Sequence, residues 1–104
     1  MNPEQIKNRI ASSIHEKDPK AEAILYGSRA RGDFKPDSDW DILILVDDPE
    51  FTNELDDKYR NELYNLSLEI EQAISINIYP KKYWKNKLRF SPLYHNVLKE
   101  GIRL

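Results

Sequence analysis

The sequence contains no cysteine, which excludes disulfide bonds and thiolate metal sites. It has no apolar run of membrane length, and its first residues lack the pattern of a secretory signal. With 104 residues, it has room for one domain with a modest core and not for a second. We therefore expect a cytoplasmic protein that forms a single domain over residues 1–104 and does not contact a membrane.

Charge is distributed unevenly along the chain, although the formal net charge is only −2. Residues 37–72 carry twelve acidic and two basic side chains, whereas residues 73–104 carry seven basic and one acidic. The acidic segment repels nucleic acid unless divalent cations intervene, while the basic segment could contact phosphates or an acidic partner. The simpler interpretation is that both segments form solvated helix faces. Direct nucleic-acid binding is therefore expected only through the basic C-terminal third, if at all.

Hydrophobic spacing predicts alternating helices and strands. A capping signal at Asn2 is followed by isoleucines every four residues, which is typical of an amphipathic helix. The apolar run after Asp41 is uninterrupted, as in a central strand buried on both faces. The predicted elements are helices over residues 3–17, 51–71, 81–89 and 91–101, a helical turn over 29–31 capped by Ser28, strands over 23–26, 40–46, 74–80 and 102–104, and a turn at 47–49. This order predicts an α/β fold, with a small mixed sheet of three to four strands packed by helices.

Two aspartates mark the start of the predicted strand at residues 40–46. Side chains alternate along a strand, so Asp39 and Asp41 project from the same face and repel each other unless a cation lies between them. Mg²⁺ suits such a pair, because it usually binds one or two carboxylates and completes its octahedron with water and substrate phosphates. In phosphoryl transfer two such ions stabilise the attacking and the leaving oxygen.

The Gly27-Ser28 corner supplies features that a phosphate group needs. Glycine lets the backbone approach phosphates without a Cβ, the amides of the following turn favour an anion, and the Ser28 hydroxyl adds a donor. Arg29 and Arg31 cannot both face a ligand across so short a turn, so one is expected to neutralise the phosphates while the other points outward. Ser38, just before the acidic pair, is a further candidate nucleotide-binding residue.

The motif Gly27-Ser28, ten residues, then Asp39-Trp40-Asp41 resembles the signature of the DNA polymerase β-like nucleotidyltransferase superfamily. The segment GSRARGDFKPDSDWDILILV resembles the minimal nucleotidyltransferases, which are small prokaryotic proteins of similar length. The resemblance is close over residues 23–46, and the predicted layout matches the nucleotidyltransferase fold over nearly the whole chain. Gly-Ser or Asp-x-Asp alone would be weak evidence, but both at this spacing form a strong signal.

The resemblance implies an enzyme that transfers a nucleoside monophosphate from a nucleoside triphosphate to a hydroxyl group and releases pyrophosphate. It implies that Gly27 and Ser28 hold the triphosphate, and that Asp39 and Asp41 are catalytic residues that bind two Mg²⁺ ions. Minimal nucleotidyltransferases are commonly encoded with a HEPN-domain partner, as toxin–antitoxin pairs in which the transferase modifies the toxin. The resemblance therefore implies a nucleoside triphosphate and a HEPN-type toxin as partners.

One strand departs from the superfamily pattern. The superfamily places a third carboxylate on the next strand, whereas the polar positions of the strand predicted over 74–80 are Ser75, Asn77 and Tyr79. Asn77 could bind a metal through its carbonyl oxygen, but it cannot act as a general base. The missing acid favours an alternative hypothesis, namely a catalytically weak or inactive antitoxin module that binds a nucleotide or a partner.

Other interpretations of the same sequence are less complete. Residues 37–41 fit the start of an EF-hand calcium loop, but Ile42 stands where glycine is needed and Asp48 where glutamate is needed. An antibiotic-modifying transferase usually carries an extra domain for its acceptor, and this chain has little room for one. Three further expectations concern other side chains. His15 and His95 are expected at the surface, and Trp40 and Trp84 in the core or at an interface rather than stacked on a base. A solvated face, rather than an RNA or partner site, is expected for Lys81, Lys82, Lys85, Lys87 and Arg89.

Overall fold

The computed structural model describes residues 1–47, 49 and 51–104. Asp48, which belongs to the predicted turn at 47–49 and to the calcium-loop alternative, lies outside the described residues. The described elements are α1 (Pro3–Lys17), β1 (Glu22–Tyr26), α2 (Ser28–Arg31), β2 (Trp40–Val46), α3 (Asn53–Ile70), β3 (Ile74–Pro80), α4 (Lys81–Lys87), α5 (Pro92–Glu100) and β4 (Ile102–Arg103). None of the described helices is both long and apolar enough to cross a membrane.

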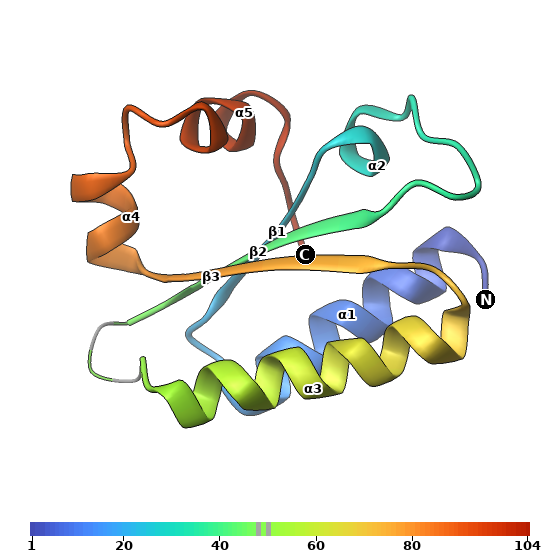
Figure 1. The fold of residues 1–104 in the computed structure, drawn as a ribbon, viewed down its shortest axis with the longest axis horizontal. Helices are drawn as coiled ribbons and strands as arrows, with labels where there is room; N and C mark the ends of the chain where they lie inside the picture. Colours follow the sequence, from blue (N-terminus) through green and yellow to red (C-terminus); the bar gives the residue numbers. More distant parts are fainter. Residues whose placement is uncertain (48, 50) are drawn as a thin grey trace.

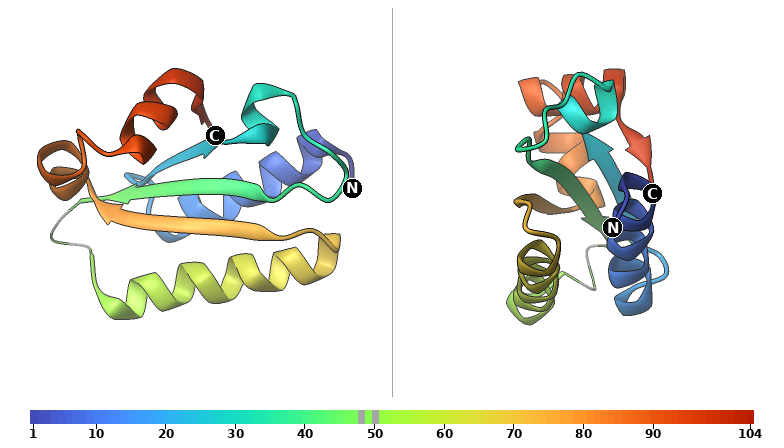
Figure 2. Two further views of the ribbon diagram at one scale, coloured as in Figure 1. Left: turned by 45° about the horizontal axis from the view of Figure 1, so that its top comes forward. Right: turned by 90° about the vertical axis from the view of Figure 1, so that its right-hand side faces the viewer.

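The strands form one mixed sheet in the order β3-β2-β1-β4. β1 pairs antiparallel with β2 and with β4, whereas β2 and β3 run parallel. Helices α1 and α3 cover one face of the sheet, and α2, α4 and α5 lie on the other side (Figure 1). The two further views in Figure 2 show the same layers from other directions. The predicted α/β fold, with a small mixed sheet packed by helices, is confirmed.

Strand β2 is the centre of the hydrophobic core, because both of its faces are buried. Alternate residues of β2 pack against α1 and α3 in one cluster, and Leu43 and Leu45 pack with Trp84 and Val97 in a second cluster on the other face. This confirms the prediction of a central strand. Trp84 is 5% exposed and Trp40 is 1% exposed, so both tryptophans are core residues as expected and neither offers a ring to a nucleobase.

Helix boundaries follow the capping residues. The capping box of Asn2 and Gln5 starts α1 as predicted. The Thr52 side chain accepts a hydrogen bond from the backbone N–H of Leu55, so α3 begins at Asn53 and not at residue 51. The prediction that Ser28 caps α2 is wrong, because Gly27 occupies the N-cap position and Ser28 is the first helical residue.

The two histidines differ in exposure. His95 is exposed, as predicted. His15 is half-buried, and its ring Nε2 lies 3.3 Å from the backbone oxygen of Leu104. His15 is therefore less exposed than His95, because the C-terminal residue packs next to α1.

Candidate functional site

The turn between β1 and α2 brings Gly27 against the side chain of Asp41. Gly27 has a φ of 77°, in the left-handed region that favours glycine, and its carbonyl accepts hydrogen bonds from the amides of Ala30 and Arg31, both at 3.0 Å. A Cβ added at Gly27 would overlap Asp41 Oδ2. The missing side chain is therefore what lets the carboxylate lie directly on the backbone of the turn.

The acidic pair lies on the sheet face opposite α1 and α3. The Trp40 side chain, between the two aspartates, is buried in the core formed with α1 and α3, so its neighbours point to the other face. Ser75 of β3 is opposite Asp41 in the strand register, and its hydroxyl donates a hydrogen bond of 3.2 Å to Asp39 Oδ2. The structure thus brings Asp39, Asp41 and Gly27 together on one side of the sheet, although Asp39 lies one residue before β2.

The surroundings of Asp41 disfavour its charged form. Its pKa is raised mainly because burial removes the carboxylate from water, and next because the negative charges of Asp39 and Glu100 repel it, while Arg31 acts in the opposite direction. Asp39, in contrast, is exposed to solvent. A cation that contacts both carboxylates would relieve this repulsion.

Asn77, the tentative metal ligand, contacts a tyrosine. Its Nδ2 donates a hydrogen bond of 2.8 Å to the hydroxyl of Tyr26, which is the cross-strand neighbour of Asp41. Burial raises the pKa of the Tyr26 phenol, and the hydrogen bond from Asn77 partly offsets this effect. Asn77 therefore fixes a neutral phenol beside Asp41, and metal binding through its carbonyl oxygen stays a prediction.

Arg29 has a structural position, and nucleotide contact by this residue stays a prediction. The residue is 7% exposed, and its guanidinium packs 4.7 Å from the ring centroid of Trp40. Its N–H groups donate to the backbone carbonyls of Pro36 and Ser38 and to the side chain of Gln72. Arg29 thus holds the loop that carries Asp39. Sequence analysis missed this role because Gln72 is distant in the chain.

The two predicted serines occupy different environments. The Ser38 hydroxyl accepts a hydrogen bond of 2.9 Å from the backbone N–H of Lys35, so it closes the turn before Asp39. Ser28 is half-buried at the start of α2, and its hydroxyl makes no hydrogen bond within the part of the chain that the structure describes. Both hydroxyls therefore keep an O–H donor that no described group accepts, because Ser38 Oγ only accepts a hydrogen bond from Lys35. Nucleotide binding by either residue stays a prediction.

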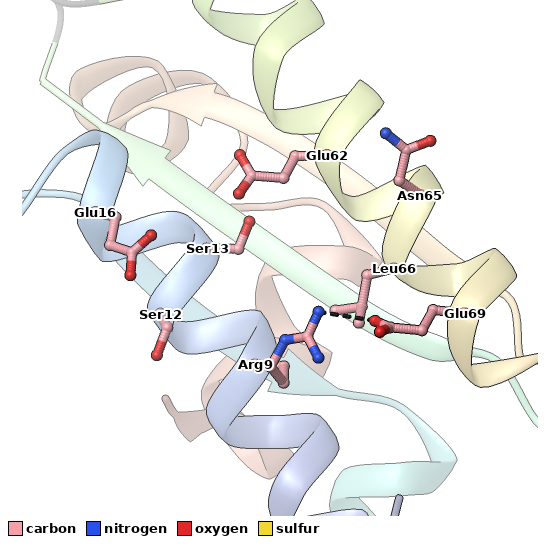
Figure 3. A pocket seen from close by; sticks show the side chains of 8 residues that line it. All are labelled: Arg9, Ser12, Ser13, Glu16, Glu62, Asn65, Leu66 and Glu69. Carbon is pink, nitrogen blue, oxygen red and sulfur yellow. Dashed lines mark hydrogen bonds and ion pairs between the residues drawn. The ribbon is translucent and has the colours of Figure 1, made fainter.

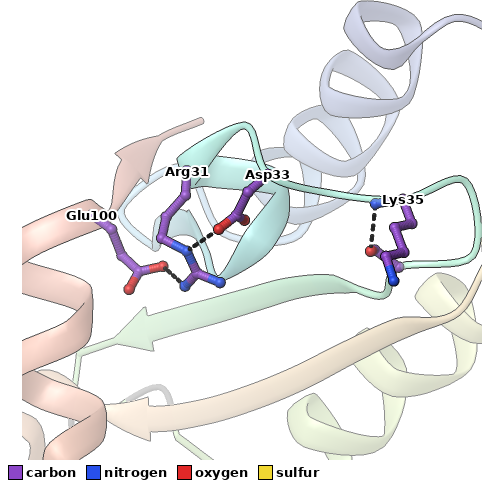
Figure 4. Close-up of polar contacts among 5 residues, drawn as sticks. Arg31, Asp33, Lys35 and Glu100 are labelled. Atoms are coloured by element: carbon purple, nitrogen blue, oxygen red, sulfur yellow. Dashed lines mark hydrogen bonds and ion pairs between the residues drawn. The ribbon is translucent and has the colours of Figure 1, made fainter.

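Arg31 is the exposed arginine of the motif, and it forms ion pairs with two carboxylates. Its Nε lies 3.1 Å from Asp33 Oδ2, and its Nη1 lies 2.8 Å from Glu100 Oε2 at the end of α5 (Figure 4). The Glu100 side chain is only 12% exposed. The sequence does not identify Glu100 as a site residue, because no spacing relates it to the motif. Its one distinguishing feature is that it is the single acidic side chain of residues 73–104.

A cleft adjoins this ion pair, between α2 and α5. Its volume is about 530 Å³, and its lining residues are Ala30, Arg31, Asn96, Lys99 and Glu100. A larger cavity of about 760 Å³ lies between α1 and α3, where Arg9 forms an ion pair of 2.7 Å with Glu69 (Figure 3). That cavity is on the sheet face away from the aspartates. The candidate site is therefore on the side of the sheet with α2 and α5, where the aspartates lie, even though the cavity there is smaller.

The basic segment that begins with α4 is partly engaged within the fold. Lys81 lies 3.2 Å from Asp47 and donates to the backbone oxygen of Lys20. The guanidinium of Arg89 lies over the ring of Phe90 at 4.8 Å. Lys82, Lys85, Lys87 and Arg89 are exposed, as expected for a solvated face, whereas Lys81 is half-buried. RNA or partner binding by the segment stays an alternative hypothesis.

Comparison with known proteins identifies relatives of the chain. A family model described as nucleotidyltransferase domain matches residues 7–104. A crystal structure of a toxin–antitoxin with AMP-PNP is similar, with a TM-score of 0.64 and 21% identity over 93% of this chain and 70% of that chain. A mutant of the toxin–antitoxin MntA-HpeT is also similar, with a TM-score of 0.62 and 22% identity over 94% of this chain and 70% of that chain. At these identities the two structures establish the fold alone. No curated protein sequence matches the chain.

Replacement of Asp41 tests the electrostatics of the site. Because the pKa of Asp41 is raised in the folded state, the ionised carboxylate costs stability once the pH rises through that pKa. Asp41→Asn should therefore be more stable than the wild type at pH 7, by up to about 1 kcal/mol since the group is partly exposed. At about pH 3, below the ordinary pKa of aspartate, the difference should vanish. Urea unfolding at both pH values measures it.

Asp37→Asn is the matched control, because Asp37 is exposed. Its free energy of unfolding should change by less than about 0.5 kcal/mol. A pH 7 stability of Asp41→Asn below that of Asp37→Asn would contradict the interpretation.

Proposed function

Because the chain belongs to the nucleotidyltransferase domain family, we propose that it transfers a nucleoside monophosphate from a nucleoside triphosphate to a hydroxyl group. The observation that carries the proposal is the contact between Asp41 and Gly27. It puts a metal-binding carboxylate within van der Waals range of a backbone turn that a phosphate can approach closely. Neither the carboxylate nor the glycine turn alone would support the reaction.

The donor set fits Mg²⁺. Asp39 and Asp41 offer hard oxygen ligands. No group of three or more histidine, cysteine, aspartate or glutamate side chains that could hold a metal ion occurs among the described residues, so the protein would supply two carboxylates at most. The remaining coordination positions would go to water and phosphate oxygens, as is usual for Mg²⁺. When bound, the metal supplies neutralisation of the charge that develops on the phosphates.

The residues of the chain then have separate tasks. Gly27 allows close approach of the triphosphate, and the Ser28 hydroxyl donates a hydrogen bond to it. The acceptor oxygen forms a bond to the α-phosphorus, the bond to the bridging oxygen of the β-phosphate breaks, and pyrophosphate leaves with that electron pair. The proton of the acceptor hydroxyl passes to water, because the site face of β3 carries Ser75, Asn77 and Tyr79 and no carboxylate. Lack of a positioned base typically costs about 10²- to 10⁴-fold in rate.

We propose a side-chain hydroxyl of a partner protein as the acceptor. The two similar solved structures are toxin–antitoxin assemblies, and one of them was determined with AMP-PNP. Together with the resemblance to minimal nucleotidyltransferases, this supports a HEPN-type toxin as the partner and ATP as one nucleotide to test. GTP, CTP and UTP belong in the same comparison.

A second function is favoured by the neutral face of β3. With Ser75, Asn77 and Tyr79 in place of an acid, the chain would bind nucleotide and partner without turnover. In that case the wild type binds Mg²⁺–nucleotide but transfers no label, and Asn77→Asp increases transfer. Turnover by the wild type at an ordinary enzymatic rate eliminates this alternative.

Substitution of Gly27 tests the contact on which the proposal depends. Gly27→Ala should push the Asp41 carboxylate away and weaken the binding of Mg²⁺–ATP by about tenfold or more, which isothermal titration calorimetry measures. Gly32→Ala is the control, because Gly32 also has a positive φ, 89°, but nothing lies near an added Cβ. Both variants lose about 1 kcal/mol of stability from backbone strain. Equal affinities of the two variants for Mg²⁺–ATP would refute the role of the contact.

Transfer itself is tested with nucleoside triphosphates labelled at the α-phosphate. Incubation with Mg²⁺ and the protein encoded by the adjacent reading frame should label that protein covalently. The double variant Asp39→Ala plus Asp41→Ala should abolish labelling, whereas Asp37→Ala, which removes an exposed carboxylate of the same loop, should retain it. If the double variant labels the partner as well as the wild type does, the proposed function is wrong.

A further inference from the structure

The cleft between α2 and α5 presents cations from two different helices. Arg31 comes from α2, and Lys99 comes from the last turn of α5. The cleft volume of about 530 Å³ is large enough for several phosphate groups and their water. No spacing in the sequence connects Lys99 with the Gly-Ser motif, so only the fold brings these two side chains to one cleft.

Both cations keep donors that no protein group uses. Arg31 donates through Nε and Nη1 to Asp33 and Glu100, which leaves its Nη2 without a partner within the described residues. Lys99 is exposed, and its ammonium makes no ion pair or hydrogen bond with any described part of the chain. The two carboxylates fix the direction of the Arg31 fork, so its free N–H groups are held in place before a ligand arrives.

The cleft lies next to the helical turn that contacts Asp41. The backbone N–H of Arg31 donates to the carbonyl of Gly27 at 3.0 Å, so one helical turn joins the cleft wall to the glycine that contacts Asp41. The charges of Arg31 and Glu100 both act on the Asp41 carboxylate. An anion bound in the cleft would therefore lie within electrostatic range of a metal ion held by Asp41.

We propose that this cleft binds the outer phosphates of the nucleoside triphosphate, with Lys99 of α5 as a phosphate-binding residue opposite Arg31 and Glu100 as the residue that positions Arg31. The inference rests on the proposed function, since it gives a binding site to the phosphates that extend beyond Gly27 and Asp41. It makes α5 a part of the nucleotide site. The ligand class is a polyphosphate, so a nucleoside monophosphate should not use Lys99.

The test compares Lys99→Gln with Lys85→Gln, which removes the same charge from an exposed position on α4. Calorimetry measures the dissociation constants of Mg²⁺–AMP-PNP and of AMP. Lys99→Gln should weaken the binding of Mg²⁺–AMP-PNP by about tenfold or more, because a charge-assisted hydrogen bond is lost, and should change the affinity for AMP by less than about twofold. Lys85→Gln should change both affinities by less than about twofold. Thermal unfolding confirms that both variants fold.

The outcomes separate the inference from the proposed function. Suppose that Lys99→Gln and Lys85→Gln bind Mg²⁺–AMP-PNP equally, while the wild type binds it and Asp41→Asn does not. The cleft is then not a phosphate site, and the proposed function stands. An equal loss of affinity for AMP and AMP-PNP in Lys99→Gln also overturns the assignment to the outer phosphates. If the unmodified protein does not bind Mg²⁺–AMP-PNP, both fail together.

Discussion

The rest of the site depends on the close approach of the Asp41 carboxylate to the backbone of Gly27. This contact follows from the antiparallel pairing of β1 and β2, which puts Tyr26 directly across from Asp41 and ends β1 at the glycine. The turn needs glycine twice, for its positive φ and for the missing Cβ. A phosphate and a metal ion can then share one corner of the sheet without a long loop to hold them.

The hydrophobic core keeps this corner in register. A shift of β2 by one residue would turn Trp40 toward the site and Asp41 into the core with α1 and α3, so burial of Trp40 strongly disfavours it. Arg29 adds a second constraint, because it connects the loop before Asp39 to Gln72 in the connection between α3 and β3. This arrangement lowers the stability of the fold, because the Asp41 carboxylate is partly removed from water and lies beside Asp39. Burial of both faces of β2 offsets this loss.

Much of the fold could be predicted because its signals are local. The capping box of Asn2 and the uninterrupted apolar run of β2 identify their elements without tertiary information. The juxtaposition of Gly27 with Asp41 could also be expected, since both lie at the ends of two consecutive strands, which usually neighbour each other in a sheet. The Arg31–Glu100 ion pair could not, because the two residues are 69 positions apart and meet only through the packing of α5. The structural role of Arg29 could not be predicted for the same reason, because its hydrogen bond to Gln72 joins residues 43 positions apart.

The central claim is that Asp39 and Asp41 share metal-bridged phosphates with the Gly27 turn. The most direct measurement is a crystal structure of the protein with Mn²⁺ and a non-hydrolysable nucleoside triphosphate, with anomalous diffraction to locate the metal. The account predicts an anomalous peak about 2.2 Å from a carboxylate oxygen of each aspartate, with phosphate oxygens completing the coordination beside Gly27. A nucleotide bound elsewhere on the protein, or a metal ion that contacts neither aspartate, would contradict it.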